Sequence, residues 1–125
     1  MRSIYVAGPM TGLPLYNWPA FEAAASFLRH MGWAVICPTE IDEELGHVEA
    51  KRNEFGDIIS VDTTDLFDYE IILGEDIKRV LTVDAIFLLP NWHKSTGARR
   101  ELAAYLGKGG TEIILNLEVF VDARQ

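Results

Sequence analysis

The chain has 125 residues, a formal net charge of -8 and a sequence pI near 4.7, and 49% of its residues are hydrophobic. This length and composition predict a single folded domain, residues 1–125, that needs neither disulfides nor metals for its core. An acidic chain without a basic cluster is a poor candidate for binding nucleic acid polymers or anionic membranes, because both require Lys and Arg to replace counterions.

The single cysteine, Cys37, excludes an internal disulfide and cysteine-based zinc motifs, and a buried thiol is expected in its apolar surroundings. The N-terminus has no long apolar core, and no apolar run approaches the length of a membrane span. We therefore expect a cytoplasmic protein with neither signal peptide nor membrane anchor.

A first strand is predicted over residues 1–7, followed by Gly-Pro-Met-Thr-Gly. This segment is neither a GxGxxG nor a Walker motif, so no dinucleotide or NTP cofactor is expected. Gly8, Thr11 and Gly12 are candidates for lining a phosphate or sugar pocket, and a tight turn without a ligand is an equally good interpretation. Tyr5 is placed for its hydroxyl to face that pocket, although a core tyrosine is the more common case.

A helix is predicted from about residue 19 to residue 31, where apolar residues recur with helical spacing before Gly32. A second strand over residues 34–37 follows and is closed by Pro38. Right-handed crossover makes these first two strands neighbours in a parallel sheet.

Residues 39–67 contain many acids and only short apolar pieces. We interpret this stretch as an acidic loop or insertion at the active site, with one short helix. A metal site would be a sharper explanation of the acids, but no two of them have a recognised ligand spacing, so a solvated loop is favoured.

Helical spacing resumes over residues 68–82, although Gly74 argues against one unbroken helix. The apolar run 85–89 is typical of a strand buried on both faces of a parallel sheet. A helix from residue 96 and a strand at 112–115 complete an α/β, Rossmann-like (flavodoxin-like) three-layer sandwich with a four- or five-stranded parallel sheet. The C-terminal remainder is either a last strand or an arm that reaches a neighbouring subunit.

The turn before the last helix is a candidate anion site. Ser95 or Thr96 can cap the helix, Gly97 lets a ligand approach the backbone, and free N–H groups converge there with the helix dipole. Glu101 shares a helical face with small and apolar residues. It is either an ordinary surface Glu paired with a nearby cation, or a carboxylate held beside a ligand at the carboxyl end of a strand.

Three motifs together resemble those of a known family. They are Ile-Tyr-Val-Ala-Gly-Pro at the start, an Asp before the third strand, and Ser-Thr-Gly-Ala-Arg-Arg-Glu-Leu-Ala after it. The family is the nucleoside 2-deoxyribosyltransferase superfamily. Within it, the chain is most similar to small, often phage-encoded proteins with Ala-Gly-Pro-Met-Thr-Gly and Trp-x-x-Ser-x-Gly-Ala-x-x-Glu signatures, and it also resembles the 2'-deoxynucleoside 5'-phosphate N-hydrolases. The resemblance covers residues 3 to about 115, apart from the acidic loop.

The resemblance implies that Glu101 is the nucleophile that attacks C1' of the sugar, that Asp76 protonates or orients the departing base, and that Tyr5 positions the nucleophile. Breaking an N-glycosidic bond develops oxocarbenium character at C1', which a neighbouring carboxylate stabilises before it forms a covalent glycosyl intermediate. Water then gives hydrolysis, whereas a second base gives transfer. No cofactor is implied.

Position 95 bears on the substrate. The transferases tend to have an acid there, whereas Ser95 matches the nucleotide hydrolases and suits a phosphate at a helix N-terminus. The resemblance therefore implies a nucleoside 5'-monophosphate, held by Ser95, Gly97 and the loop from Gly8 to Gly12. The hydrolases have an Arg in that loop and this chain has none, so phosphate recognition is either weaker or supplied by Arg99 or a partner chain.

Other candidate contacts follow from the same resemblance. Trp92, His93 and Tyr16 are placed to stack on the base, with packing or lid roles as alternatives. Asn116 is matched to a family Asn that reaches over from a neighbouring subunit, and a homodimer or higher homo-oligomer is implied. Two further readings stay open: a non-catalytic nucleotide-binding or sensing protein on the same fold, and hydrolysis of another N-glycoside, such as a nicotinamide nucleotide or a signalling nucleotide.

Overall fold

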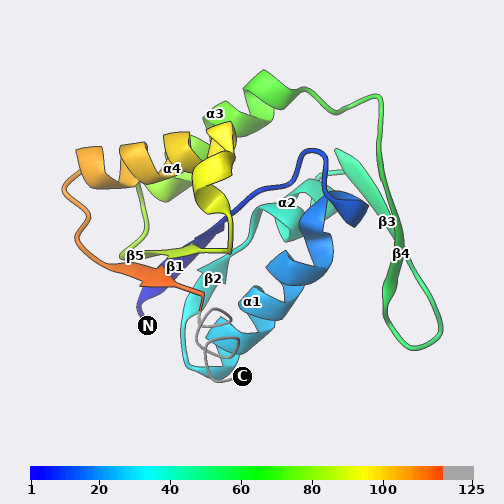
Figure 1. The fold of residues 1–125 in the computed structure, drawn as a ribbon, viewed down its shortest axis with the longest axis horizontal. Coiled ribbons are helices and arrows are strands. Elements are labelled where there is room, and N and C mark those ends of the chain that lie inside the picture. The colour runs from blue at the N-terminus through cyan, green and yellow to red at the C-terminus, as the bar shows by residue number, and fades with distance from the viewer. Residues whose placement is uncertain (117–125) are drawn as a thin grey trace.

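A computed structural model describes residues 1–116 and contains a four-stranded parallel sheet in the order β2-β1-β5-β6 (Figure 1). Its strands are β1 (Ser3–Ala7), β2 (Ala34–Ile36), β5 (Ala85–Leu88) and β6 (Ile113–Leu115). The α-helices are α1 (Trp18–His30), α2 (Pro38–Glu44), α3 (Tyr69–Val80) and α4 (Thr96–Gly107). The predicted α/β, Rossmann-like architecture is confirmed. The expectation for the C-terminal remainder lies outside the described residues, apart from Asn116.

The sheet is the middle of three layers, with α1 on one face and α3 and α4 on the other (Figure 1). Side chains of a strand alternate between faces, and β1 follows this rule. Ile4 and Val6 pack in the cluster that contains Phe21 of α1, whereas Tyr5 packs in the cluster that contains Tyr105 of α4. This alternation points Tyr5 towards the side of the sheet that carries α3 and α4.

Helix α3 corrects one expectation, because it is unbroken across Gly74. A Cβ at Gly74 would meet no atom within 4 Å, so the glycine lies on an open side of the helix and disturbs no packing. The helix is fixed instead by its ends and its buried face. Asp68 caps it by accepting a hydrogen bond from the backbone N–H of Ile71 at 3.2 Å, and Ile72 and Val80 are buried.

The stretch over residues 39–67 is also not the loop that was expected. The one short helix is present as α2, but β3 (Val48–Arg52) and β4 (Ile58–Thr63) form an antiparallel hairpin after it. Figure 1 shows this hairpin extending beside α1, away from the parallel sheet. The acids of the stretch therefore lie mostly on a small two-stranded sheet and a helix.

Two local features explain the hairpin. Val48 and Val61 pack against Trp18, which is 2% exposed at the start of α1. The side chain of Asn53 accepts hydrogen bonds from two backbone N–H groups of the turn, those of Phe55 and Asp57. A bulge in β3 interrupts the alternation of inward and outward side chains along that strand. The sequence pattern therefore did not reveal the hairpin.

Candidate active site

One pocket lies at the carboxyl ends of the parallel strands, where open α/β sheets bind ligands. The loop after β1, helix α2 after β2, and the N-terminus of α4 after β5 all contribute to its wall, together with α3 and the hairpin. It encloses about 850 Å³ outside the protein atoms, open solvent at its mouth included. We call it the carboxylate pocket, because Asp42, Asp76 and Glu101 line it.

Glu101 is the central acid of this pocket. It lies in the second turn of α4 and is only 6% exposed, and the hydroxyl of the fully buried Tyr5 donates a hydrogen bond to its Oε2. Burial raises the pKa of Glu101 to about 8; the Tyr5 hydrogen bond lowers this pKa, while the charges of Asp76 and Asp42 raise it. The structure thus excludes the ordinary surface Glu and brings together two residues that are 96 positions apart.

The phenol of Tyr5 is a permanent donor in this arrangement. Burial, and then the negative charge of Glu101, raise the pKa of Tyr5 well above its ordinary value. The hydroxyl therefore keeps its proton at neutral pH. A proton that always points at a carboxylate favours the ionised form of that carboxylate and fixes its orientation.

Asp76 is the second predicted acid, and it is also 6% exposed. The guanidinium of Arg79 donates to its Oδ1 at 2.9 Å within the same helix. Burial and the charge of Asp42 raise the pKa of Asp76 to about 6, against the lowering effects of Arg79 and of the Tyr5 hydroxyl. Asp76 therefore titrates close to neutral pH, as a group that must hold and release a proton requires.

Asp42 is a third buried carboxyl that the sequence analysis did not single out. It lies on α2, inside the stretch interpreted as a solvated loop, and it is 6% exposed. Nδ1 of His47 lies 3.4 Å from its Oδ1. Burial raises the pKa of Asp42, while His47 lowers it. Thr39 lies three residues before it on the same helical face and is also buried, but this burial is a property of the packed chain and leaves no signal in the sequence.

A second pocket adjoins the first and shares Met10, Thr11, Tyr69, Ser95 and Gly97 with it. We call it the α4 pocket, because the N-terminus of that helix forms one wall. Its other lining residues are Pro9, Leu13, Asn91, Lys94 and Thr96. No Asp or Glu is among them, so its charge comes from a lysine and from a helix N-terminus.

Four of the predicted loop residues line the carboxylate pocket: Gly8, Thr11, Ser95 and Gly97. Ser95 is the cap of α4, since its Oγ accepts from the backbone N–H of Ala98 at 3.1 Å. Gly8 has a packing reason as well, because a Cβ there would lie 2.7 Å from Cβ of Leu89. The tight-turn and ligand interpretations of the first loop are therefore compatible.

Three predicted contacts lie elsewhere. Gly12 adopts φ 81 in the turn and lines neither pocket. Trp92 packs against the buried cluster around Ile86 on the sheet and makes an edge contact with His93, so it also lines neither pocket. Asn116 follows β6, where its backbone N–H donates to the carbonyl of Leu88 at 3.1 Å, away from both pockets.

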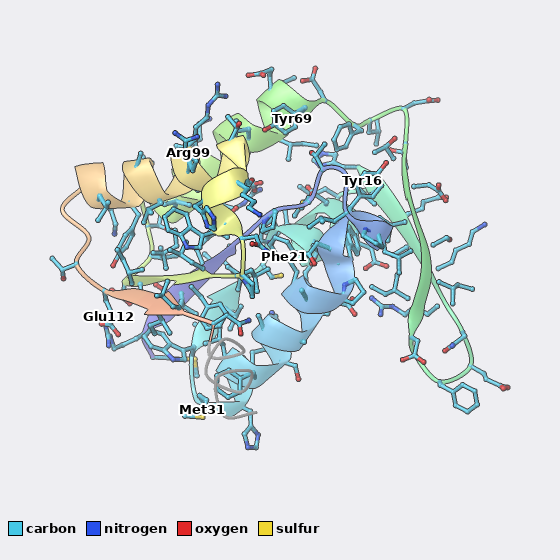
Figure 2. All side chains as sticks on the ribbon, in the orientation of Figure 1. Tyr16, Phe21, Met31, Tyr69, Arg99 and Glu112 are labelled. Atoms are coloured by element: carbon cyan, nitrogen blue, oxygen red, sulfur yellow. The ribbon has the colours of Figure 1, made fainter. Side chains whose placement is uncertain are left out.

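The positive charge at the α4 pocket comes from a different residue than expected. Arg99 is exposed and lines neither pocket, and Figure 2 shows it on the outside of α4. Lys94 lines the α4 pocket instead. It precedes the cap of the helix by one residue, a place where a basic side chain lies beside the free N–H groups.

Aromatic side chains cover much of the carboxylate pocket. Tyr16 was a predicted stacking residue and lines it, as do four aromatic residues that the sequence did not mark: Trp18, Phe21, Phe67 and Tyr69. Figure 2 shows Tyr69 at the start of α3 and Tyr16 in the segment before α1, with Phe21 on α1. Flat apolar surfaces beside carboxyl groups suit a ring with polar edges.

A family model described as Domain of unknown function (DUF4406) matches residues 2–68. The chain belongs to this family. The matched region runs from β1 through the hairpin, so it includes Tyr5 and Asp42 but ends before Asp76 and Glu101. No curated protein and no solved structure matches the chain.

The pocket of this DUF4406 protein is lined by three buried carboxyls. Within residues 1–116, no group of three or more His, Cys, Asp or Glu side chains is arranged to hold a metal ion. The same range contains no helix that is long and apolar enough to span a membrane. Two of the carboxyls in the DUF4406 pocket, Glu101 and Asp76, have pKa values on either side of neutral pH.

Proposed function

We propose that this protein is an N-glycosidase that cleaves the base-sugar bond of a (deoxy)nucleoside 5'-monophosphate by hydrolysis or base exchange. The observation that carries the proposal is the hydrogen bond from the buried Tyr5 to the buried Glu101, with Asp76 in the same pocket. The resemblance to the nucleoside 2-deoxyribosyltransferases supports it, because the same three residues match the motifs of that superfamily.

Glu101 acts as the nucleophile. Tyr5 holds Oε2, which leaves Oε1 to attack C1'. As the C1'–N bond breaks, its electron pair moves to the base, and the positive charge that develops at C1' favours the ionised form of Glu101. The C1'–O bond of a glycosyl intermediate forms in the same step. Attack by water or by a second base on C1' then releases Glu101.

Asp76 supplies the proton to the departing base and takes one back from the attacking water. Between about pH 6 and about 8 the pair of Asp76 and Glu101 carries one proton. In the resting protein this proton is more often on Glu101, which has the higher pKa. In the reactive form the proton is on Asp76 and Glu101 is ionised. Tyr5 favours this form, because it donates to the Glu101 carboxylate.

The two pockets suit the two ends of a nucleotide. A phosphate is attracted by Lys94 and by the N-terminus of α4, and it is repelled by the three carboxyls of the other pocket. The base therefore enters the carboxylate pocket, between aromatic side chains. This places the sugar at the boundary, where Ser95 and Gly97 line both pockets.

The proposal extends to assembly and location. We propose a homodimer or higher homo-oligomer, as the resemblance implies. Several large apolar side chains from the end of the hairpin to the first turn of α3 are exposed, among them Leu66 and Ile71. A cytoplasmic location is part of the same proposal, since the lone Cys37 forms no internal disulfide and the expected substrates are cytoplasmic metabolites. Sedimentation velocity of the purified protein tests the assembly.

The decisive experiment is chromatographic. Wild type, Glu101→Gln and the control Glu44→Gln are incubated with nucleosides and nucleoside 5'-monophosphates, with and without an added free base. Glu44 is an exposed acid on α2, so its variant removes one charge without touching either pocket. We expect base release from monophosphates by wild type and Glu44→Gln, and a loss of about a thousandfold or more in Glu101→Gln.

The same experiment separates the alternative. A carboxyl with a pKa of about 8 is protonated at neutral pH and donates a hydrogen bond to a ligand, as a nucleotide-sensing protein requires. Such a protein binds nucleotides in calorimetry and releases no base. Folded wild type that releases base from no member of the panel would overturn the glycosidase proposal, and retained activity in Glu101→Gln would overturn the role of that residue.

A further inference from the structure

The proposed reaction gives roles to Glu101 and Asp76 but none to Asp42, the third carboxyl that lines the pocket. Its side chain is 9% exposed and lies on α2, which follows β2 at the opposite edge of the pocket from α4. A buried carboxyl is costly unless something interacts with it. The position of Asp42 between the sheet and the hairpin wall therefore calls for a specific role.

The orientation of the substrate places the base near Asp42; this step rests on the proposed function. The phosphate end lies in the α4 pocket, whose lining includes Lys94 and no acid. Glu101 and Tyr5 mark the position of C1'. The base then extends from C1' into the remainder of the carboxylate pocket, which Asp42 lines.

His47 restrains one side of the Asp42 carboxyl. Its Nδ1 lies 3.4 Å from Oδ1, and its backbone N–H also donates to the backbone carbonyl of Asp42 at 2.9 Å. Among the described residues, no hydrogen bond reaches Oδ2. His47 thus orients the Asp42 carboxyl through Oδ1, and Oδ2 remains available to accept a hydrogen bond from a ligand.

We propose that Asp42 selects the base, by accepting a hydrogen bond from an exocyclic amino group, and that His47 is its positioning residue. An ionised carboxylate can only accept, so it binds the amino group of adenine or cytosine and repels the carbonyl oxygen at the equivalent place in hypoxanthine or uracil. A buried site of this kind discriminates strongly, because the wrong base leaves the carboxylate without a partner.

The test measures binding, so that it does not depend on turnover. Dissociation constants are measured by calorimetry for the deoxynucleoside 5'-monophosphates of adenine, hypoxanthine, cytosine and uracil. The protein is Glu101→Gln, with and without Asp42→Asn. We expect Glu101→Gln to bind each amino nucleotide about 10- to 100-fold more tightly than its oxo counterpart, and the double variant to lose this preference. The amide of Asn both accepts and donates, so it tolerates either edge.

Two controls keep the outcome specific. Glu44→Gln in the same background changes the charge of α2 equally and should leave the preference intact. His47→Ala should reduce the preference while Asp42→Asn abolishes it. Equal binding of amino and oxo nucleotides, a preference that survives Asp42→Asn, or no binding of any of the four would overturn the inference. Failure of the proposed function is seen separately, as absence of base release by wild type.

Discussion

At the scale of single residues, the decisive feature is that Asp76 and Glu101 line one pocket with raised pKa values, while the buried Tyr5 donates a hydrogen bond to Glu101. Glu101 and Tyr5 were matched from motifs, and the structure joins them by a hydrogen bond. The alternative interpretation of Glu101 as an ordinary surface residue is wrong. Its face of α4 is turned towards the sheet, and only 6% of the residue is exposed. The motif identified the residues, and the packing of α4 determined their environment.

The protonation of this pair gives a pH prediction. For wild type, kcat/KM should rise with pH as the pair loses its first proton near pH 6 and fall as it loses the second near pH 8. In Asp76→Asn the residual rate should lose the falling limb, because Glu101 alone then titrates and its ionised form is the reactive one. The rising limb should move to higher pH, because the titration of Glu101 replaces the first titration of the pair near pH 6; loss of the Asp76 charge keeps this pKa below about 8.

Rates measured across the pH range with a released-base assay check this prediction. A falling limb that persists in Asp76→Asn would remove Asp76 from the role of acid. Arg79→Met is the matched comparison, because it removes the ion pair that lowers the pKa of Asp76; it should keep the falling limb and move the rising limb near pH 6 to higher pH.

At the scale of elements, the N-terminus of α4 combines a structural and a binding task in one residue. Ser95 caps the helix through its Oγ and lines both pockets. Substituting Asp retains the cap, because Asp and Ser are equally good at this position, but places a negative charge where the phosphate is proposed to bind. Substituting Ala removes the cap and adds no charge. The two variants therefore separate the tasks.

We expect Ser95→Asp to keep the stability of wild type and to lose activity on monophosphates by about tenfold or more relative to nucleosides. Ser95→Ala should lose about 1 kcal/mol of unfolding free energy and only part of its preference for monophosphates, because it removes a hydroxyl but adds no charge. Urea unfolding and the nucleotide-to-nucleoside ratio of kcat/KM measure both effects. An unchanged ratio in Ser95→Asp would place the phosphate elsewhere.

The hairpin shows where element prediction failed. Residues 39–67 offered no long periodic pattern, and their acids suggested a solvated loop. The strands are stabilised because Val48 and Val61 pack against Trp18, which precedes Val48 by 30 positions. Asn53 stabilises the turn by accepting two backbone hydrogen bonds. Contacts of this kind are tertiary and leave little trace in a local window. The same error concealed Asp42, which only the folded chain brings to the pocket.

At the scale of the whole molecule, the buried acids make stability depend on pH. The folded pKa values of Glu101, about 8, and Asp76, about 6, lie above their ordinary values of 4.5 and 3.8. The folded state therefore binds these protons more tightly than the unfolded state does. Their contribution to stability is fully present below about pH 4 and is lost as the pH rises through the folded pKa values.

Glu101→Gln cannot ionise and should avoid part of this loss. We expect its unfolding free energy, relative to wild type, to increase by at least about 2 kcal/mol between pH 5 and pH 8.5. Denaturant unfolding at several pH values measures it, and the exposed Glu44→Gln should run parallel to wild type. Parallel curves for Glu101→Gln would show that the carboxyl is ionised at little cost in the folded protein.

The sequence by itself determined the strand-helix alternation, the parallel sheet and the motif residues around Tyr5, Ser95 and Glu101, because these depend on local periodicity and on short, ordered motifs. Only the tertiary structure decided which acids share the pocket and which cation stands beside the α4 pocket. Asp42 lies far from Asp76 and Glu101 in the chain, and Lys94, just before α4, lines the α4 pocket whereas Arg99, within α4, does not. Burial and proximity are properties of the packed layers, and no local pattern encodes them.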